Sequence, residues 1–586
     1  MPPKRKATPK ATSKSTTAVQ PDAPAGKKLK GGAKLKKEAD AKAAAVTPSD
    51  AKSAFIKPGV LAPGIRPIIP PCDAVVKYAS KSAWRVYIGP DGTIYDCMMN
   101  QTNINANNNK FYRLQILVDV ASGSVFACLF NWGRVGAPGQ NSWATFQSFE
   151  GAFSVFSRKF QDKTKCRWES RDEAVAKPGV YVPIEMDYLG ESDLEKIAGA
   201  DMEATNGVGG DSGGDADAAV KCELSEPLQS LMEMITDTQM FQSTLQSMDI
   251  DIKKMPLGRI TLAQVSSGYR CLAEVAEALQ HGKTNLLEPL SSKFYTLIPH
   301  SFGMRRPPVL NSLVIVKQKM ELMETLLDME AASDVMNAKR DAKDVLPEHP
   351  LTTRYKALHC DLQVVKPGNK TFKMIEAYVE RTHGNTVAHR HQLTVKDIFA
   401  VERDGEKSRF MRTLPNRRLL WHGSRTANFC GILSQGLRIA PPEAPSTGYM
   451  FGKGIYFADM VTKSANYCGV GNREDGILLL CEVALGDMHC LTNADSSLNK
   501  SSLDKMSKHS TWGQGRQTPD YDQAVVVDKK VIVPCTAPIR PAHPLDSEGK
   551  VLDQSKSFYL EYNEFIVYDV AQVQIRYLVR CNFKPK

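Results

Sequence analysis

The stretch from residue 189 to 222 most constrains how this chain folds. It is rich in Gly, Asp and Ala, it contains the run Gly207–Asp211, and its apolar residues follow neither the helix nor the strand period. Such a composition cannot bury enough apolar surface to offset the entropy of ordering the chain, so it predicts a flexible acidic linker. The segments on either side must therefore fold around separate cores, and a length of 586 residues allows about two to four folded units.

Residues 1–71 form a second segment that is predicted to lack a core. Residues 1–52 hold 13 Lys and Arg against 4 Asp and Glu, a balance of +9 within the whole-chain charge of +11. Clusters such as Lys4-Arg5-Lys6 lie among Ala, Thr, Ser and Pro, which is typical of a disordered basic arm. Such an arm suits a nuclear-import signal or contact with nucleic-acid phosphates, and a solubilising tail is the alternative.

Two segments have the patterns of strands. Within residues 72–188, the short apolar runs 111–118 and 124–130 are flanked by Asn and Gly, as strand ends require, and they predict a small β-rich domain. Comparable runs at 476–483 and 564–569 predict a strand-rich α+β domain over residues 350–586.

The segment between them, residues 223–345, follows the period of a helix. Thr261 is placed to cap one predicted helix and Gly282 to end it. Two sets of apolar residues have helical spacing: Val265, Tyr269, Leu272, Val275 and Leu279, then Leu313, Val316, Met320, Met323 and Leu327. The pattern predicts an all-α bundle, and a Met-containing stripe of this kind is more often core than a binding surface. The fold class is thus multidomain α+β.

Several classes of protein are excluded. No apolar run reaches 18 residues, and a basic, Pro-rich stretch follows Met1 where a signal peptide needs an apolar segment, so an intracellular location is predicted. The 13 cysteines include no CxxC pair, which argues against zinc fingers and a disulfide framework. Residues 448–454 lack P-loop spacing, no HExxH is present, and the glycines at 207–210 follow no strand as a Rossmann motif requires.

Four strings remain that carry chemistry. They are LWHGSR at 420–425, YMFGKGIYFAD at 449–459, KSANY at 463–467 and YNEF at 562–565. In these strings the chain resembles the poly(ADP-ribose) polymerases, over most of residues 350–586. The resemblance implies an ADP-ribosyltransferase catalytic domain that takes NAD+ as substrate and needs no metal.

The family's catalytic triad falls on His422, Tyr456 and Glu564, and the resemblance implies that they line one cleft. Taken singly, each residue has an ordinary structural explanation, because a lone His is usually structural, a Tyr in a strand usually core, and a Glu in an edge strand usually solvated. The joint occurrence of the strings favours the functional interpretation.

The chemistry of these positions can also be argued directly. The carboxamide of nicotinamide needs a donor and an acceptor, which the backbone of Gly423 and the hydroxyl of Ser464 could supply, and its ring needs a flat face, which Tyr467 could supply while Tyr456 closes the other side. Loss of nicotinamide leaves an oxocarbenium-like ribose, so a carboxylate near the 2′-hydroxyl stabilises the developing positive charge. Glu564 fits that role, and it could also orient or deprotonate an acceptor hydroxyl, which favours polymer formation.

The resemblance adds further positions. It implies that Ser424, Gly431 and Arg438 belong with His422 to the NAD+ pocket. It implies that Tyr562, Met450 and Lys463 lie on the acceptor side, although Lys463 could equally be a solvated surface charge.

Upstream, the run Asn131–Gly136 carries the Trp-Gly-Arg signature after which the family's WGR domain is named. The region at 72–188 therefore resembles a sensor of DNA breaks. An exposed Trp132 indole can stack on a terminal base or sugar, and the Arg134 guanidinium can grip a 5′-phosphate. Asn107, Lys110 and Tyr181 match further DNA-contacting positions, with turn, surface and core roles as the alternatives.

The helical segment at 254–258 and 294–300 resembles the family's regulatory helical domain, which restrains catalysis until DNA binds. We therefore expect a nuclear, DNA-break-activated polymerase that modifies itself and chromatin proteins in the DNA damage response, with a mono-ADP-ribosyltransferase or an inactive DNA-end scaffold as alternatives. The short arm without zinc fingers resembles the family's short-armed members. The chain ends at Cys581–Lys586 without the Leu-Trp ending that animal members offer to a serine-directing accessory factor.

Overall fold

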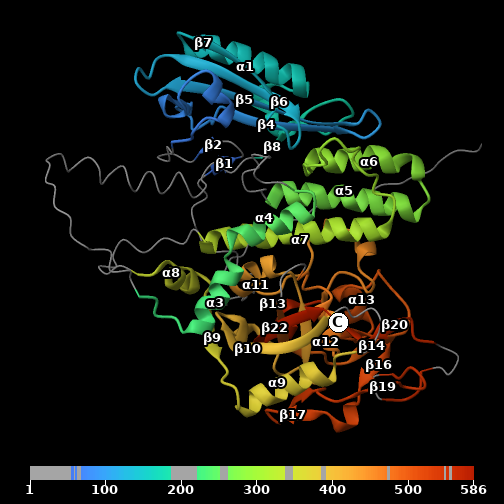
Figure 1. Cartoon of the computed structure of the whole chain (residues 1–586). Coiled ribbons are helices and arrows are strands. Elements are labelled where there is room, and N and C mark those ends of the chain that lie inside the picture. Colours follow the sequence, from blue (N-terminus) through green and yellow to red (C-terminus); the bar gives the residue numbers. More distant parts are fainter. Residues whose placement is uncertain are drawn as a thin grey trace, which may run out of the picture. The chain divides into compact units, whose positions relative to one another are not determined.

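Two long neighbouring strands, β5 (Asn108–Asp119) and β6 (Phe126–Arg134), form the centre of the first sheet (Figure 1). The computed structural model that gives this fold describes residues 55–57, 60–61, 68–185, 221–250, 262–336, 348–384, 391–470, 475–546, 549–552 and 557–585. The predicted basic arm and acidic linker lie almost entirely outside these ranges, as do Thr261 and residues 254–258.

The first sheet is antiparallel, with the order β7-β6-β5-β4-β8 and β3 paired to β5. Alternate residues of β6 enter different cores, because Phe126, Cys128 and Phe130 point to one face and Ala127 and Leu129 to the other. The remaining elements of this region are β3 (Trp84–Val86), β4 (Asp96–Asn103), β7 (Gln140–Phe146), α1 (Phe149–Thr164) and β8 (Val182–Ile184), after a short hairpin of β1 (Phe55–Lys57) and β2 (Val60–Leu61).

Helix α1 covers one face of this sheet (Figure 1). The Ser148 hydroxyl caps its start by accepting from the Gly151 amide, and Lys165 ends it with a left-handed backbone, φ 59°. Phe156 and Phe160 follow the helical spacing and are fully buried against the sheet. The predicted β-rich domain is thus present, with one helix that the strand patterns did not indicate.

In the described residues five helices follow, and α5, α6 and α7 lie side by side (Figure 1). Val265, Tyr269 and Leu272 are buried in their common core, and Gly282 follows α5 with φ 63°, so the predicted helix and its end are confirmed. The five helices are α3 (Glu226–Ile235), α4 (Thr238–Ser247), α5 (Leu262–Gln280), α6 (Thr284–Leu297) and α7 (Leu313–Met336).

The described residues between 348 and 585 contain three sheets. The largest has the order β17-β18-β11-β13-β22-β10-β9, the second β12-β21-β15-β14 and the third β19-β16-β20. The strands are β9 (Cys360–Val364), β10 (His391–Arg403), β11 (Arg417–Gly423), β12 (Ile455–Phe457), β13 (Asp475–Ala484), β14 (Met488–Leu491), β15 (Ser510–Gly513), β16 (Gly515–Pro519), β17 (Val525–Val527), β18 (Val531–Val533), β19 (Pro538–Ile539), β20 (Leu560–Tyr562), β21 (Glu564–Val567) and β22 (Val573–Pro585). The helices are α8 (Pro350–Ala357), α9 (Lys370–Arg381), α10 (Glu406–Arg409), α11 (Phe429–Gln435), α12 (Val461–Ala465) and α13 (Lys500–Lys505).

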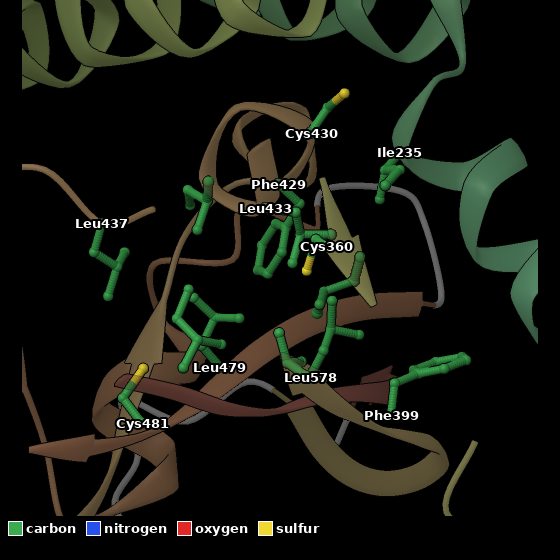
Figure 2. Close-up of a cluster of buried hydrophobic side chains, with 14 of the residues drawn as sticks. Ile235, Cys360, Phe399, Phe429, Cys430, Leu433, Leu437, Leu479, Cys481 and Leu578 are labelled. Carbon is green, nitrogen blue, oxygen red and sulfur yellow. The ribbon is translucent and has the colours of Figure 1, made fainter. Parts of the chain in front are cut away.

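The large sheet is buried on both faces. Phe372, Ile375 and Tyr378 of α9 pack on one face, and Phe429 and Leu433 of α11 on the other. Figure 2 shows the second cluster, in which Ile235 of α3 lies with residues of α11 and the sheet. Residues of α3, of α4 and of the C-terminal end of α7 (Ala332 and Val335) therefore share a core with the large sheet, whereas α5, α6 and the rest of α7 form a second core, which also includes Ile104 and Ala444.

A buried ion pair stabilises the first sheet. The Arg113 Nε donates to Asp96 Oδ1 at 2.9 Å, and Gln115 Nε2 donates to Asp96 Oδ2 at 3.0 Å. The side chains of Arg113 and Asp96 are only 10% and 0% exposed, so neither charge can turn to water.

We expect Asp96→Ala to lower the free energy of unfolding of this sheet by about 3–5 kcal/mol, because it leaves the Arg113 guanidinium buried without its carboxylate. Asp172→Ala, at an exposed position of the same region, should change it by less than about 0.5 kcal/mol. Native-state hydrogen exchange of the β4, β5 and β6 amides measures both effects. Equal effects of the two substitutions would contradict the assignment.

Candidate active site

The large sheet and the second sheet meet through two backbone hydrogen bonds. Trp421 N donates to Ala458 O at 2.8 Å, and Ala458 N donates to Trp421 O at 2.9 Å. These bonds place the end of β11, which carries His422, beside the end of β12, which carries Tyr456. Strand β21 pairs with β12 and begins at Glu564, so the three predicted triad residues come from three strands that meet at this junction.

His422 is held by the backbone of β12. Its Nδ1 lies 2.9 Å from Tyr456 O. A carbonyl oxygen only accepts, so Nδ1 carries the hydrogen in this pair, and a neutral ring keeps a lone pair on Nε2. Burial lowers the pKa of His422, which favours the neutral imidazole. The ring can therefore accept a hydrogen bond from a hydroxyl group.

Tyr456 holds a turn. Its hydroxyl accepts from the Phe451 amide at 3.0 Å and donates to Gly452 O at 2.7 Å. Burial raises the pKa of the phenol far above neutral pH. Its ring stacks on Tyr449, with centroids 6.1 Å apart and an interplanar angle of 27°. Tyr456 therefore fixes the turn at Phe451 and Gly452, and its hydroxyl keeps its proton at neutral pH.

Glu564 forms a buried ion pair. Lys463 Nζ lies 2.8 Å from Glu564 Oε1, and the two side chains are 15% and 12% exposed. The same ammonium donates to Tyr562 O at 3.1 Å. Within the described ranges, the buried Glu564 Oε2 has no hydrogen-bond partner. This burial argues against the solvated-surface interpretation of Lys463 and the solvated-edge interpretation of Glu564, because β21 lies between β12 and β15.

Gly423 and Ser464 are in close contact. A Cβ added to Gly423 would lie 1.8 Å from Ser464 O, so only glycine fits beside α12 here. Tyr467 follows α12 and keeps 44% of its surface exposed. The structure thus brings together the three residues predicted to bind nicotinamide.

The three other predicted pocket residues lie along the next segment. Ser424 Oγ accepts from Asn428 Nδ2 at 2.9 Å. Gly431 is buried on α11, and a Cβ added there would lie 2.7 Å from Asp328 O of α7. Arg438 donates one hydrogen bond to Gln435 Oε1 at 2.7 Å and another to the Asp328 carboxylate.

The predicted acceptor-side residues are buried or half-buried. Tyr562 is 5% exposed, and its backbone carbonyl accepts a hydrogen bond from Lys463 Nζ. Met450 is half-buried against a small cluster that contains Phe451 and Ile566. The side chain of Lys463 contacts the triad directly, at Glu564 Oε1.

One face of α7 lies along the predicted NAD+ residues, which the sequence pattern did not indicate. Lys317 Nζ is 5.5 Å from the ring centroid of Tyr467, and the Tyr449 hydroxyl donates to Glu324 Oε1 at 2.7 Å. Asp328 pairs with Arg438. The helical spacing of positions 317, 324 and 328 could have placed these charges on one face, but not against a domain distant in sequence.

Burial alters the titration of this face. Burial raises the pKa of Glu324 to about 7, although the hydrogen bond from the Tyr449 hydroxyl acts in the opposite direction. Burial also raises the pKa of Asp328 to about 6, although the positive charge of Arg438 opposes this shift. The pKa of Lys317 is raised because its neighbours Tyr467, Glu321 and Glu564 outweigh burial.

Three of the predicted DNA-contacting residues lie on the neighbouring strands β5 and β6, whereas Asn107 precedes β5 and Tyr181 precedes β8. Trp132 pairs with Tyr112, and Arg134 with Lys110, across β6 and β5. Because residues i and i+2 of a strand share a face, Trp132 and Arg134 point the same way. The indole is half-buried and not exposed as expected, because it stacks on Tyr112 at 5.6 Å and 11°. Tyr181 meets the other edge of Tyr112 at 6.1 Å.

Arg134 is occupied by other parts of the chain. It donates to Asn107 O at 2.7 Å, to Asn107 Oδ1 at 2.9 Å and to Arg305 O at 2.9 Å, and it also donates to Gly303 O. The last two carbonyls belong to the loop between α6 and α7. Asn107 adopts a left-handed backbone, φ 47°, and Lys110 is exposed. The sequence indicated Arg134 as a phosphate contact but not as a contact to the helical region.

Two features are absent from the described part of the chain. No helix there is long and apolar enough to cross a membrane. No group of three or more His, Cys, Asp or Glu there is arranged to hold a metal ion. All 13 cysteines lie in the described part, and each is a free thiol.

Three family models match the chain. They are the poly(ADP-ribose) polymerase catalytic domain at residues 369–583, the poly(ADP-ribose) polymerase regulatory domain at 222–355 and the WGR domain at 95–175.

Curated relatives agree with these matches. The chain is 39% identical to poly(ADP-ribose) polymerase 2 of Homo sapiens, over 89% of this chain and 84% of that protein. It is 40% identical to poly(ADP-ribose) polymerase 2-A of Oryza sativa subsp. japonica, over 84% of this chain and 70% of that protein. It is also 40% identical to poly(ADP-ribose) polymerase 1 of Gallus gallus, over 84% of this chain but only 46% of that longer protein. The chain therefore belongs to the poly(ADP-ribose) polymerase family and is an ADP-ribosyltransferase that uses NAD+.

Proposed function

We propose that this protein is a nuclear poly(ADP-ribose) polymerase that is activated by DNA breaks and extends ADP-ribose chains on proteins, itself included, in the DNA damage response. The observation that carries the polymerase assignment is the buried Lys463–Glu564 pair beside Gly423, Ser464 and Tyr467. It leaves one carboxylate oxygen of Glu564 for the substrate. The predicted basic arm, which lies outside the described residues, would supply nuclear import.

Glu564 acts on the reacting ribose in this proposal. Lys463 fixes Oε1, so Oε2 can accept a hydrogen bond from the ribose 2′-hydroxyl. As the bond to nicotinamide breaks, positive charge develops on the ribose, and a fixed carboxylate in a site shielded from water stabilises it strongly. The same oxygen can take the proton of an acceptor hydroxyl in chain extension.

His422 and Tyr456 position NAD+. The lone pair on His422 Nε2 suits a hydroxyl of the adenine-side ribose. Tyr456 and Tyr467 supply aromatic walls for the nicotinamide ring, and Gly423 with Ser464 supplies polar groups for its carboxamide. Neither tyrosine is available as a base at neutral pH, because burial raises the pKa of both.

The DNA-sensing surface is proposed to comprise Trp132, Arg134, Asn107, Lys110 and Tyr181. A 5′-phosphate that captured the Arg134 guanidinium would compete with the carbonyl oxygens of Gly303 and Arg305. DNA binding would then loosen a contact to the helical region. Recognition would not depend on base sequence, because phosphate contacts do not read bases.

Helix α7 is proposed to restrain the enzyme in the absence of DNA. NAD+ carries a cationic nicotinamide ring, and the ammonium of Lys317 lies against the Tyr467 face where that ring would stack. Farther along α7, the Asp328 carboxylate forms an ion pair with Arg438, which is one of the predicted NAD+ residues. A displacement of α7 would free both groups, which is a population shift between a closed and an open state.

For the reaction, we expect Glu564→Gln to abolish long polymer and to lower nicotinamide release by about 100-fold or more, since it removes a transition-state charge interaction. Nicked, 5′-phosphorylated DNA and NAD+ are supplied, and products are sized on a gel. Glu561→Gln, at a half-buried position in β20, is the matched control and should form normal polymer. Wild-type polymer from Glu564→Gln would refute the role. Single-unit products from the unaltered chain would identify a mono-ADP-ribosyltransferase. Binding of DNA without release of nicotinamide would identify an inactive scaffold.

For DNA sensing, we expect Arg134→Ala to weaken binding to a 5′-phosphorylated nick by about tenfold or more, because a hydrogen bond to a charged group contributes about 1.5–3 kcal/mol. Arg85→Ala, on exposed β3 at the opposite end of β5, should bind normally. Fluorescence anisotropy with 5′-phosphate and 5′-hydroxyl nicks measures the effect. Equal binding of the two nicks by the unaltered protein would contradict a phosphate contact.

For restraint by α7, the raised pKa of Glu324 predicts a pH dependence. In the closed state Glu324 keeps its proton up to about pH 7, whereas in the open state it releases the proton at a lower pH. Opening is therefore favoured as pH rises from about 5 to about 7, and the effect levels off above that range. For one titrating group, the ratio of open to closed protein changes at most about tenfold per pH unit. We expect the ratio of DNA-free to DNA-saturated activity to rise over that window and to rise less in Glu324→Gln. A ratio with the same pH profile in both proteins would refute the proposal.

A further inference from the structure

One fully buried carboxylate near the site has no part in the reaction as proposed above. Asp459 follows β12 and is 0% exposed. Its Oδ2 accepts from Asn563 Nδ2 at 2.7 Å, from the Tyr521 hydroxyl at 3.0 Å and from Thr518 Oγ1 at 3.5 Å. Its Oδ1 has no hydrogen-bond partner in the part of the chain that the structure describes. A buried carboxylate is costly, so the two short hydrogen bonds from Asn563 and Tyr521 to one oxygen indicate a carboxylate that is specifically held.

Asn563 is the main partner of Asp459 and the residue immediately before Glu564. It is 1% exposed, and its amide is fully used. Its Oδ1 accepts from the Gly515 amide at 2.9 Å, and its Nδ2 donates to Asp459 and to Thr518 Oγ1, the latter at 2.9 Å. Because an amide has only two N–H groups, both directions are fixed. The hydrogen bonds of the Asn563 side chain therefore also hold the backbone immediately before Glu564 in place.

Asp459 also lies next to the other elements of the site. The preceding residue, Ala458, forms the paired hydrogen bonds to Trp421, the residue before His422. The following segment leads into α12, which carries Lys463. The chain around Asp459 is therefore tied to the strand of His422 on one side and to the strand of Glu564 on the other.

Two links thus join the segment 459–463 to the segment 562–564. One is the Asp459–Asn563 hydrogen bond, and the other is Lys463, which contacts Tyr562 O and Glu564 Oε1. The Lys463 ammonium lies at the end of a long, flexible four-carbon side chain, so it positions its partner only weakly. With this contact alone, the Glu564 carboxylate could still rotate. The rigid link is the one through Asn563.

We infer that Asp459 is a positioning residue for ADP-ribosyl transfer, which acts through Asn563 to fix the Glu564 carboxylate against the reacting ribose. The inference rests on the proposed role of Glu564. Burial raises the pKa of Asp459, while hydrogen bonds from Asn563 and Tyr521 and the charge of Arg418 lower it. The Arg418 guanidinium lies 4.4 Å from the ring centroid of Tyr521, so the cluster contains its own counter-charge.

A positioning role makes a distinct kinetic prediction. The interaction of Glu564 with the ribose strengthens as positive charge develops, so a displaced Glu564 would mainly reduce the stabilisation of the transition state and would change ground-state binding little. We expect Asp459→Asn, which keeps the size but removes the charge, to lower kcat for nicotinamide release by about 10-fold to 100-fold, the range expected for small misplacements. The KM for NAD+ should stay within about twofold.

The experiment uses the full chain with saturating nicked DNA and compares Asp459→Asn with Asp487→Asn, an exposed carboxylate between β13 and β14. Thermal melting of each variant reports folding. If Asp459→Asn does not fold, Tyr521→Phe removes one donor to the same oxygen and should give a smaller fall in kcat with unchanged KM. An unchanged kcat, or equal changes in kcat and KM, in a folded variant would overturn the inference.

A double variant separates this inference from the proposed function. If Asp459 acts through Glu564, adding Asp459→Asn to Glu564→Gln should lower the rate of nicotinamide release little further. The residual release is measured with enzyme in excess. Additive losses would overturn the positioning role. Wild-type activity of Glu564→Gln alone would instead refute the role of Glu564 on which the inference rests.

Discussion

The structure of the catalytic region depends on the paired backbone hydrogen bonds between Trp421 and Ala458. Without them the large sheet and the second sheet would have no register, and the ends of β11, β12 and β21 would not meet. Trp421 is fully buried, and its ring lies 4.8 Å from that of Tyr378 on α9, so the bridge is anchored in the core. The residues that follow the bridge on its two strands are His422 and Asp459, one predicted to bind NAD+ and the other inferred to position the catalytic carboxylate.

The helical region is packed into the catalytic region in two different ways. Helices α3 and α4 share the apolar core of the large sheet, where Leu231, Met232 and Ile235 are fully buried. Helix α7 does both, because Ala332 and Val335 enter the same apolar core, whereas Glu324 and Asp328 form polar contacts with Tyr449 and Arg438 whose strength depends on charge. The apolar contacts favour a permanent attachment, whereas the polar contacts suit an interface that opens, because ionic groups exposed by opening regain water.

The contact between the first sheet and the helical region is partly apolar, through Ile104 and Val135, and partly polar. Asn100 Nδ2 donates to Tyr295 O at 2.8 Å, Asn109 Nδ2 donates to His300 O at 2.8 Å, and Arg134 binds the loop that follows. These bonds are directed at backbone carbonyls, so they fix geometry more than they bury apolar surface. A ligand that captured Arg134 would therefore act directly on the helical region, which is the physical basis of the proposed activation by DNA.

The sequence by itself determined the order and class of the elements, because helix and strand periods are local. It placed the strands β5, β6, β13 and β21 and the helices α5 and α7, and the strings around His422, Tyr456 and Glu564 indicated the family. Only the tertiary structure decided which distant groups meet: Lys463 with Glu564, Asp328 with Arg438, and Asp459 with Asn563. It also decided that Trp132 is covered by Tyr112 and that Arg134 holds the α6–α7 loop. Such contacts follow from the packing of domains and the register between sheets, and no periodicity within a single segment encodes them.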